Sequence, residues 1–273
     1  ASAFAYHTVM RGCSNFCAYC VVPFVRGPEE SLPPEDILEA VKRKIDSGAS
    51  EITLLGQNVL AYGYDLEPRR SLADVLELVH DLPGLTWLRY VTSHPAWVTE
   101  DFLRRAASLP KVCEHFHVPF QSGDDEILGL MNRGYSASRY VEVTDMIKHY
   151  FPSAGLTADA IVGFPGETPA HFENTLALIE RVRPDNIYSF MYSVRPGTTA
   201  AEMPGEPTLE EKRRRLAQLN EAEDVISRAI NESLIGSRLD VMVESCGGGR
   251  CRGRTRTNKL TDFSTAKEYA PGE

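Results

Sequence analysis

Three cysteines near the N-terminus have the spacing of a metal-ligand set. The segment RGCSNFCAYC places Cys13, Cys17 and Cys20 in a C-x3-C-x2-C pattern. Thiolates this close together in the chain can wrap one face of a metal ion or an iron–sulfur cluster, and three protein ligands leave one position open for an exogenous ligand. The alternatives are free thiols and a structural zinc loop, with His7 as a fourth ligand. No second C-x2-C pair lies nearby, so the spacing favours an open site that takes a ligand.

Short β-rich runs alternate with amphipathic helices and must position this loop. The strand candidates are residues 6–10, 51–55, 87–92, 115–120, 156–162 and 186–192. Helical patterns lie between them, and Ser71 and Thr168 are expected N-caps of two helices. Repeated strand–helix units predict parallel strands with helical crossovers. Six such units predict an α/β fold, either an open sheet or a partial barrel.

Chemically unusual residues follow each of these strands. They form the cysteine loop and the segments 56–58, 93–95, 121–123, 163–167 and 193–198. In parallel α/β folds the ligand site lies at the carboxyl ends of the strands. We therefore expect six separate loops to converge on one rim, which is stronger support for a site than any one loop alone.

The chain changes character after residue 205. A long helix is expected from about 208 to 234, and the pattern becomes β-rich after Gly236. The expected domains are a partial barrel (1–205), a connecting helix (206–235) and a β segment (236–273). Between residues 245 and 260 there are five basic residues and no acidic one, although the whole chain carries a net charge of −9. The five are Arg250, Arg252, Arg254, Arg256 and Lys259. Alternate spacing would place the four arginines on one face of a strand, where RNA phosphates would relieve their repulsion.

Composition excludes several classes of protein. With 273 residues, 42% hydrophobic and 25% charged, the chain can bury a large core and is not disordered. No apolar run approaches the roughly 20 residues of a membrane-spanning helix. The first residues lack the pattern of a signal peptide and do not begin with Met, so we expect a fragment or a processed form.

The cysteine loop resembles that of the radical S-adenosylmethionine (SAM) superfamily, with the aromatic Tyr19 before the last cysteine. The resemblance implies that Cys13, Cys17 and Cys20 hold a [4Fe–4S] cluster whose fourth iron binds SAM. Reductive cleavage of SAM would then release a 5′-deoxyadenosyl radical. The superfamily fold is a partial (β/α)6 TIM-like barrel, which agrees with the six units counted above.

Several further segments resemble, in order and spacing, the MiaB-like tRNA methylthiotransferases. They are GCSNFCAYCVVPFVRG, LLGQNVLAYG, HVPFQSG, LMNRGYS, DAIVGFPGET and YSVRPGT, and GRTRTNKL resembles the start of the RNA-binding TRAM domain of that family. The resemblance implies addition of a methylthio group at C2 of N6-isopentenyladenosine 37 in tRNA. Relatives that act on t6A37 or on ribosomal protein S12 are alternatives, and a metal-stabilised RNA-binding module without radical chemistry is the alternative from another class.

The resemblance also suggests which polar residues contact SAM. Gln57 and Asn58 would lie near its methionine part, Ser122 near its ribose with Gln121 orienting it, and Gly163 near its adenine. Arg195 would pair with the SAM carboxylate or with an RNA phosphate. Tyr19 and Ser93 complete the expected cofactor site. Polar turns, a helix cap at Ser122 and loop geometry at Gly163 are the structural alternatives. No side-chain base is expected, because the radical itself removes hydrogen.

Two departures from the family predict a truncated chain. The N-terminal domain with three more cysteines and a second cluster is missing, and 38 residues after 235 are about half of a TRAM domain. The implied partners are the tRNA anticodon stem-loop and a reducing protein such as a flavodoxin or ferredoxin. We expect a cytoplasmic monomer that does not contact membranes.

The remaining cysteines and histidines are expected to be structural. Cys113 should be a small buried hydrophobe. Cys246 and Cys251 flank a glycine turn, and in a cytosolic protein we expect them to be free thiols rather than a hairpin disulfide. His94, His115 and His117 lie in or beside strands and are expected at core or rim positions.

Overall fold

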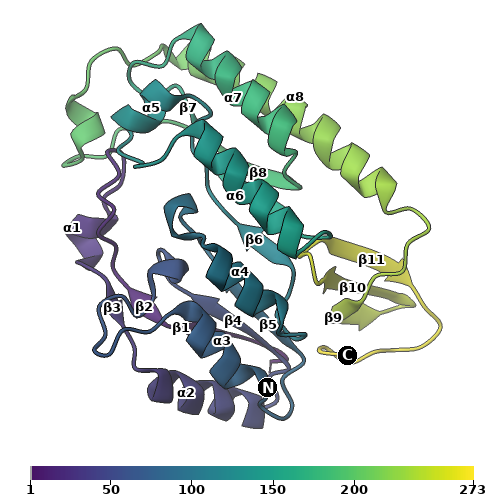
Figure 1. Ribbon diagram of the computed structural model, residues 1–273. Helices are drawn as coiled ribbons and strands as arrows, with labels where there is room; N and C mark the ends of the chain where they lie inside the picture. The colour runs from purple at the N-terminus through teal and green to yellow at the C-terminus, as the bar shows by residue number, and fades with distance from the viewer. Residues whose placement is uncertain (1) are drawn as a thin grey trace.

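Six parallel strands form the centre of the computed structural model, which describes residues 2–273 (Figure 1). The strands are β1 (Phe4–Thr8), β4 (Glu51–Leu55), β5 (Trp87–Val91), β6 (His115–His117), β7 (Gly155–Val162) and β8 (Asn186–Met191). β1, β4 and β5 pair in that order, as do β6, β7 and β8. A bridge between Leu88 and Val112 and a 3.0 Å hydrogen bond from the Ser93 N–H to the His117 carbonyl join the two halves. Within the described residues β1 and β8 do not pair, so the strands form the expected partial barrel.

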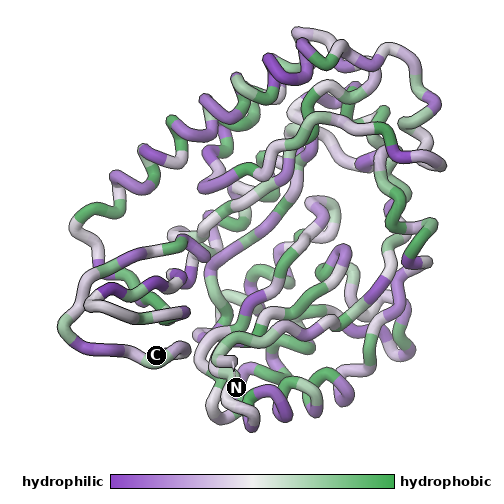
Figure 2. Tube along the Cα trace, turned by 180° about the vertical axis from the view of Figure 1, so that it is seen from behind, coloured by the Kyte–Doolittle hydropathy of each residue, from purple (hydrophilic) through white to green (hydrophobic). Residues whose placement is uncertain are grey.

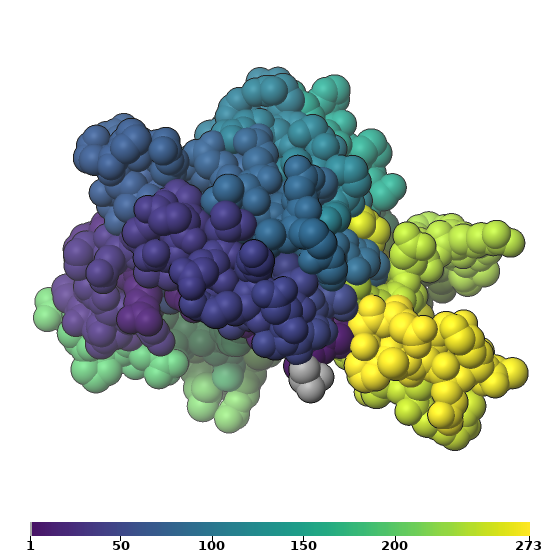
Figure 3. Space-filling model, turned by 90° about the horizontal axis from the view of Figure 1, so that it is seen from below, coloured from purple at the N-terminus to yellow at the C-terminus, as the bar shows by residue number. Residues whose placement is uncertain are grey.

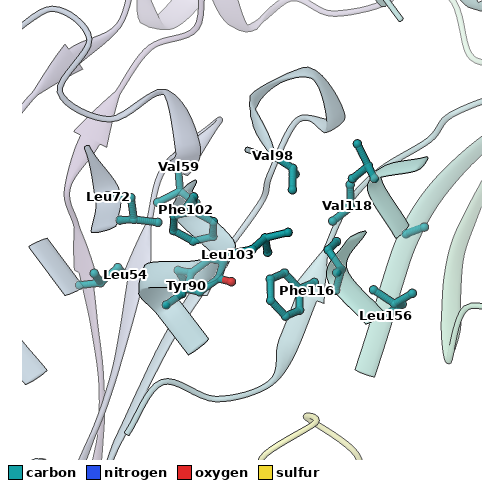
Figure 4. Close-up of a cluster of buried hydrophobic side chains, with 14 of the residues drawn as sticks. Leu54, Val59, Leu72, Tyr90, Val98, Phe102, Leu103, Phe116, Val118 and Leu156 are labelled. Atoms are coloured by element: carbon teal, nitrogen blue, oxygen red, sulfur yellow. The ribbon is translucent and has the colours of Figure 1, made fainter. Parts of the chain in front are cut away.

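Helices cover the outer face of these strands. They are α2 (Pro34–Asp46), α3 (Leu72–His80), α4 (Glu100–Ala107), α6 (Ala137–Tyr150) and α7 (Pro169–Val182). Both predicted N-caps are confirmed, because the side chains of Ser71 and Thr168 accept hydrogen bonds from the third residue of their helices. Alternate strand residues point outward into the core, where Tyr90 packs edge-to-face against Phe102 and Phe116 at 5.5 and 5.9 Å between ring centroids (Figure 4). The other residues of each strand therefore face the inside of the barrel.

Two expected strands differ from the structure. Residues 115–120 were predicted as one strand, but β6 ends at His117. Residues 6–10 were predicted as one strand, but β1 ends at Thr8. Met10 and Arg11 form β2, which pairs antiparallel with β3 (Glu30–Ser31). This ribbon joins the chain before and after the cysteine loop, which also contains the short helix α1 (Val22–Arg26). β1 ends early because Met10 pairs with Ser31 on the other side of the cysteine loop instead of continuing the parallel sheet.

The C-terminal part consists of one long helix and a small sheet. The predicted long helix is α8 (Leu209–Ser233), in which hydrophobic and hydrophilic residues alternate (Figure 2). Its buried Leu219 and Ile226 belong to the main core. The sheet contains β9 (Val241–Gly247), β10 (Arg250–Thr255) and β11 (Leu260–Ser264), all antiparallel, and forms a lobe beside the main body (Figure 3). No helix among residues 2–273 is both long and apolar enough to cross a membrane.

The small sheet docks on the N-terminal ends of the barrel strands. Arg89 on β5 donates hydrogen bonds to Glu51 and to the carbonyls of Thr255 and Arg256, each at 2.9 Å. Gly155, at the start of β7, lets the chain approach, because a Cβ there would lie 2.5 Å from the carbonyl oxygen of Thr257. We call this end of the barrel the floor and the end with the cysteine loop the mouth.

Candidate functional site

A cavity of about 370 Å³ lies at the mouth, among the carboxyl ends of the strands. Its walls are formed by Cys13, Asn15, Cys17, Tyr19, Cys20, Val22, Gly56, Gln57, Thr92, Ser93, His94, Pro119, Gln121, Arg133 and Asp159. The three cysteines and four of the predicted cofactor residues therefore share one cavity. Those four are Tyr19, Gln57, Ser93 and Gln121. The loops after β1, β4, β5 and β6 contribute to this wall, so convergence of the loops is confirmed for them.

Backbone contacts on both sides hold the cysteine loop. Gly12 has a φ of +73°, and a Cβ at this position would lie 1.7 Å from the carbonyl oxygen of Pro28. Cys13 donates its N–H to the Gly27 carbonyl at 3.1 Å, and Ala18 donates to the Met131 carbonyl at 2.9 Å. Glycine is required where two backbone segments come this close. The loop is thus anchored to the segment that follows it and to the end of helix α5 (Asp125–Leu130).

The thiols surround the cavity but do not meet at one point. Among the described residues, no three His, Cys, Asp or Glu side chains form a group that could hold a single metal ion. A [4Fe–4S] cluster is larger and takes its thiolates at separate iron atoms, so its ligands need only surround it. Partial burial raises the pKa of Cys13 and Cys20 above the ordinary thiol value. Binding of a cluster would therefore displace protons from these thiols.

Buried polar atoms without partners concentrate at this cavity. Gln57 Oε1, Asn58 Nδ2, Ser93 Oγ and His94 Nε2 are buried and have no hydrogen-bond partner in the described residues. A buried polar atom without a partner costs about 1–3 kcal/mol, so such atoms are rare unless a ligand satisfies them. Gln57, Ser93 and His94 line the cavity wall, and Asn58 lies behind it with its Oδ1 accepting from the His94 N–H at 3.1 Å. The wall fits a polar ligand such as the amino-acid part of SAM.

His94 has a defined hydrogen-bonding role. Burial, followed by the nearby charge of Arg133, lowers its pKa from 6.5 to about 3, so the ring is neutral at neutral pH. Its Nδ1 accepts a hydrogen bond from the Ala96 N–H at 3.3 Å, which places the single proton on Nε2. The unpaired Nε2–H is therefore a donor in the cavity wall, available to a carboxylate or hydroxyl.

Residues with strained backbone conformations also lie at the cavity of the mouth. Among the described residues, six other than glycine have positive φ, and four of these line the cavity or directly precede or follow a residue that does. These four are Phe16 (47°), Thr92 (73°), Gln121 (68°) and Asn132 (55°). Such conformations cost about 1–3 kcal/mol each, and they are least favourable for a β-branched residue such as Thr92. These turns lie in the segments after β5, β6 and α5, and Ser93, Gln121 and Arg133 line the wall.

Arg133 and Asp159 are cavity residues that sequence reasoning missed. Arg133 is 6% exposed and donates to the Pro119 carbonyl at 3.0 Å and to Cys17 Sγ at 3.3 Å. It belongs to the LMNRGYS segment, but nothing in that segment alone marks the arginine as buried. Asp159 had a clear signal, because it is the one charged residue in the apolar strand 156–162. Alternation along that strand places it opposite the residues that face the core.

The other predicted SAM contacts lie away from the cavity wall. Ser122 is buried and accepts from the Asp124 N–H at 3.2 Å, and Asp124 caps α5, so its contacts are those of the structural alternative. Gly163 packs against Lys212, whose Cγ would lie 2.3 Å from an added Cβ. The side chain of Arg195 is exposed to solvent. Roles for these three residues stay predictions.

The predicted RNA-binding cations are largely paired within the chain. Arg252 pairs with Asp262, Arg254 with Glu244 and Arg256 with Glu114, each at 2.8 Å, and Lys259 pairs with Asp185. The expectation that four arginines share one face is wrong for Arg256. β10 ends at Thr255, and beyond a bulge after Arg252 the chain turns so that Arg256 docks on Glu114 and the carbonyls of residues 110 and 112 at the floor.

The C-terminal cysteines also differ from expectation. Cys246 and Cys251 form a disulfide, so the prediction of free thiols is wrong. The register of β9 and β10 places these two residues directly opposite each other, with 4.1 Å between their Cα atoms. Cys113 is a free thiol, 1% exposed, beside Trp87 and Met242, which confirms its prediction as a small buried hydrophobe.

The fold and the cysteine site together define the class of protein. The profile of the radical SAM superfamily matches residues 8–179, and the chain belongs to this superfamily. The predicted cofactors, a [4Fe–4S] cluster and SAM, are those of the superfamily. Two solved structures share the fold at 14% identity. TsrM, a radical SAM methyltransferase from Kitasatospora setae, matches with a TM-score of 0.60 over 72% of this chain and 38% of its own. The coproporphyrinogen III oxidase HemN from Escherichia coli matches with 0.57 over 95% and 71%.

Two relatives with much higher sequence identity indicate a group within the radical SAM superfamily. The chain is 48% identical over 262 residues to tRNA-2-methylthio-N(6)-dimethylallyladenosine synthase of Moorella thermoacetica, and 44% identical over 267 residues to the protein of that name in Clostridium botulinum. These matches cover 95% and 97% of this chain, and in each case 59% of the relative. The resemblance to the tRNA methylthiotransferases is therefore confirmed, over about three-fifths of the length of these relatives.

Proposed function

We propose that this chain is the catalytic core of a radical SAM enzyme that adds a methylthio group at C2 of N6-isopentenyladenosine 37 in tRNA. The observation that carries the proposal is the cavity at the mouth, which combines three cysteine thiols with three buried polar atoms that have no partner in the described residues. The names of the relatives in Moorella thermoacetica and Clostridium botulinum support the substrate. The bound cluster and SAM would supply one-electron cleavage of the sulfonium and a 5′-deoxyadenosyl radical.

The residues of the chain have distinct tasks in this scheme. Cys13, Cys17 and Cys20 would each donate one thiolate to the cluster. The guanidinium of Arg133, 3.3 Å from Cys17 Sγ, would stabilise the negative charge of the thiolates. Gln57 offers an acceptor oxygen and the neutral His94 a donor nitrogen, which suit the ammonium and carboxylate of the SAM methionine part.

Tyr19 would support the cavity wall and take no part in the reaction. Its hydroxyl accepts a hydrogen bond from Arg133 at 3.4 Å, and burial raises the pKa of Tyr19 far above its ordinary value, so it stays neutral. Thr92 and Gln121, held in strained conformations, fix the ends of β5 and β6 beside the cavity. A rigid wall of this kind fixes the geometry of a bound ligand before reaction.

Several wider expectations belong to this proposal. They are the domain limits at 205 and 235, a TRAM-like role for residues 236–273, SAM contacts by Asn58, Ser122, Gly163 and Arg195, and RNA contacts by the cations of β10. A reducing protein as electron donor, a monomeric state and a cytoplasmic location also belong here. The methylthio group would replace the hydrogen at C2 of the base.

Anaerobic reconstitution with iron and sulfide tests the proposal directly. With dithionite and SAM the protein is expected to form 5′-deoxyadenosine and to absorb in the charge-transfer region of iron–sulfur clusters. Failure to form it, although iron and sulfide are bound, would rule out the enzymatic function. Bound zinc, together with RNA binding that is unchanged by SAM, would instead support a metal-stabilised RNA-binding module.

A further inference from the structure

A ladder of polar side chains lines the inner face of β6 and β7. His115 Nε2 and His117 Nδ1 each lie 3.0 Å from Thr157 Oγ1, and His117 Nε2 lies 3.5 Å from Asp159 Oδ1. Asp159 also belongs to the wall of the cysteine cavity. The residues that alternate with them, such as Ala158, are buried in the core on the opposite face. The ladder therefore leads from the inside of the barrel to the cysteine cavity.

Exposed aromatic residues stand beside this ladder on the edge strand β8. The register pairs Asp159 with Tyr188 and Ile161 with Phe190, so both aromatics share the inner face. The ring of Tyr188 lies 5.8 Å from that of His117 between centroids. Tyr188 is 50% and Phe190 55% exposed, although neighbouring Ile187 is buried. Large exposed aromatics on an inner face next to polar groups suit a flat, polar-edged ligand.

A second cavity continues this face toward the floor. It has a volume of about 410 Å³, and its walls include Thr157, Tyr188, Arg254 and Lys259. Thr157 and Tyr188 thus connect the ladder with two cations of the C-terminal sheet. The pair of Arg254 with Glu244 is partly exposed, at 41% and 29%, so an incoming phosphate can compete for the guanidinium. Aromatic rings beside cations are the usual elements of a single-stranded RNA site.

On the basis of the function proposed above, we infer that this inner face binds the target adenine after it leaves its RNA loop. Tyr188 stacks on the base, the Asp159 carboxylate accepts the exocyclic N6–H, and Arg254 holds a neighbouring phosphate. The occupant follows from the chemistry of the wall. A carboxylate accepts hydrogen bonds, so it selects the amino group of adenine over purine riboside, which carries only hydrogen at the same position. A base bound on this inner face lies next to the cysteine cavity, because Asp159 belongs to the walls of that cavity.

Binding of short RNA hairpins tests this assignment without turnover. The probes are two labelled 17-nucleotide anticodon-type hairpins that carry adenosine or purine riboside at the position after the anticodon, and fluorescence anisotropy reports affinity. The 273-residue chain is expected to bind the adenosine hairpin about five- to tenfold more tightly, because purine riboside has no amino group and leaves Asp159 unpaired. Asp159→Asn should bind both hairpins alike, because an amide can turn to accept or donate. Equal affinity of the wild-type chain for the two hairpins overturns the assignment of Asp159.

Substitutions on β8 test the stacking. Tyr188→Ala is expected to weaken both hairpins about tenfold, and Tyr188→Phe to keep the wild-type affinity, because stacking needs the ring and not the hydroxyl. Val225→Ala, on the exposed side of α8 at 66% exposure, is the matched control and should change nothing. An unchanged affinity in Tyr188→Ala, with a circular-dichroism spectrum like that of the wild type, overturns stacking. Reductive SAM cleavage by the wild-type chain without RNA separately tests the proposed function, so the two failures are distinguishable.

Discussion

The two ends of the barrel differ in how completely their polar groups are paired. At the mouth, Gln57, Ser93 and His94 each carry a buried polar atom that has no partner in the part of the chain the structure describes. At the floor, Arg89 uses its three guanidinium nitrogens in hydrogen bonds to Glu51 and to two carbonyls of the C-terminal sheet. Unpaired buried groups lower stability unless a ligand satisfies them, whereas paired ones hold the fold together. The mouth is therefore built for an added ligand, and the floor is built to hold the C-terminal sheet.

The same contrast applies to backbone conformation. Thr92, directly after β5, and Gln121, four residues after the end of β6, adopt left-handed conformations at the mouth. At the floor, the close approach of Thr257 to the barrel is accommodated by Gly155, which has no Cβ. Strain persists where the surrounding structure enforces it, and it concentrates at functional sites. Asn258, beside this contact, also has a positive φ (67°), but asparagine tolerates this conformation far better than the β-branched Thr92 at the mouth.

The largest expected effect is the loss of the cluster and of SAM cleavage when the mouth alone is changed. Cys17→Ala removes one of three cluster ligands, so reconstituted iron and 5′-deoxyadenosine formation should both fall to background. Iron and sulfide analysis, the visible spectrum and chromatography of the SAM products measure this. Cys113→Ala is the matched control at the floor, where the thiol is a buried hydrophobe beside Trp87. It should keep full iron content and cost roughly 1 kcal/mol of stability, as a small buried truncation does. Iron retained in Cys17→Ala would contradict the ligand assignment.

The next largest effect is a loss of stability when the contacts at the floor are removed. Arg89→Ala leaves Glu51 buried without its partner and leaves the carbonyls of Thr255 and Arg256 without a donor. Loss of one member of a buried ion pair costs about 3–5 kcal/mol, so the free energy of unfolding in urea should fall by that amount. The double variant Arg89→Met with Glu51→Leu should recover part of the loss, because no charge is then left unpaired. A single Arg89→Ala variant as stable as the wild type would show that the sheet does not depend on this contact.

Much of the fold is predictable from local sequence patterns. Alternating strand and helix signals give the six parallel strands, and cap residues such as Ser71 and Thr168 fix where helices begin. The early end of β1 was not predictable, because Met10 pairs with Ser31, a contact across the cysteine loop. The pairing of Arg256 with Glu114 is similar, since it joins residues 142 positions apart. Local periodicity contains no information about such distant partners.

The site was predictable where residue type alone limits the chemistry. Three closely spaced cysteines have few other uses, and Gln57, Ser93 and Gln121 follow strands whose ends must meet. The buried position of Arg133 depends on the tertiary packing of α5 against the cysteine loop, which no spacing rule describes. The disulfide between Cys246 and Cys251 depended on strand register, and a general expectation about compartment was a weaker guide than the hairpin itself.

Acid should destabilise both ends by the same mechanism. Burial lowers the pKa of His94 at the mouth, and of His115 on the inner face, from 6.5 to about 3. Between pH 6.5 and 3 the unfolded chain binds protons that the folded chain does not, so stability is lost as the pH falls through this window. Each histidine should contribute a slope of roughly 1 kcal/mol per pH unit.

Urea unfolding at several pH values from 7 to 5 measures this slope while most carboxylates remain ionised. His115→Asn keeps a polar side chain that can contact Thr157 but does not titrate, so the slope should fall by the contribution of one histidine. His94→Asn provides the same comparison at the mouth. If neither variant changes the slope, these histidines do not stay neutral in the folded protein.

The smallest expected effect is on RNA affinity, and it distinguishes arginines that stabilise the fold from arginines that are available to bind RNA. Among the described residues Arg250 makes no ion pair, whereas Arg256 binds Glu114 and two carbonyls. If β10 meets RNA, Arg250→Ala should lower the affinity for a hairpin only slightly and reduce the slope of log K against log salt by about 1, as loss of one phosphate contact does. Arg256→Ala should leave that slope unchanged and lower the urea midpoint instead. The opposite assignment, with the salt slope changed only in Arg256→Ala, would mean that RNA displaces Glu114 and that the floor opens when the substrate binds.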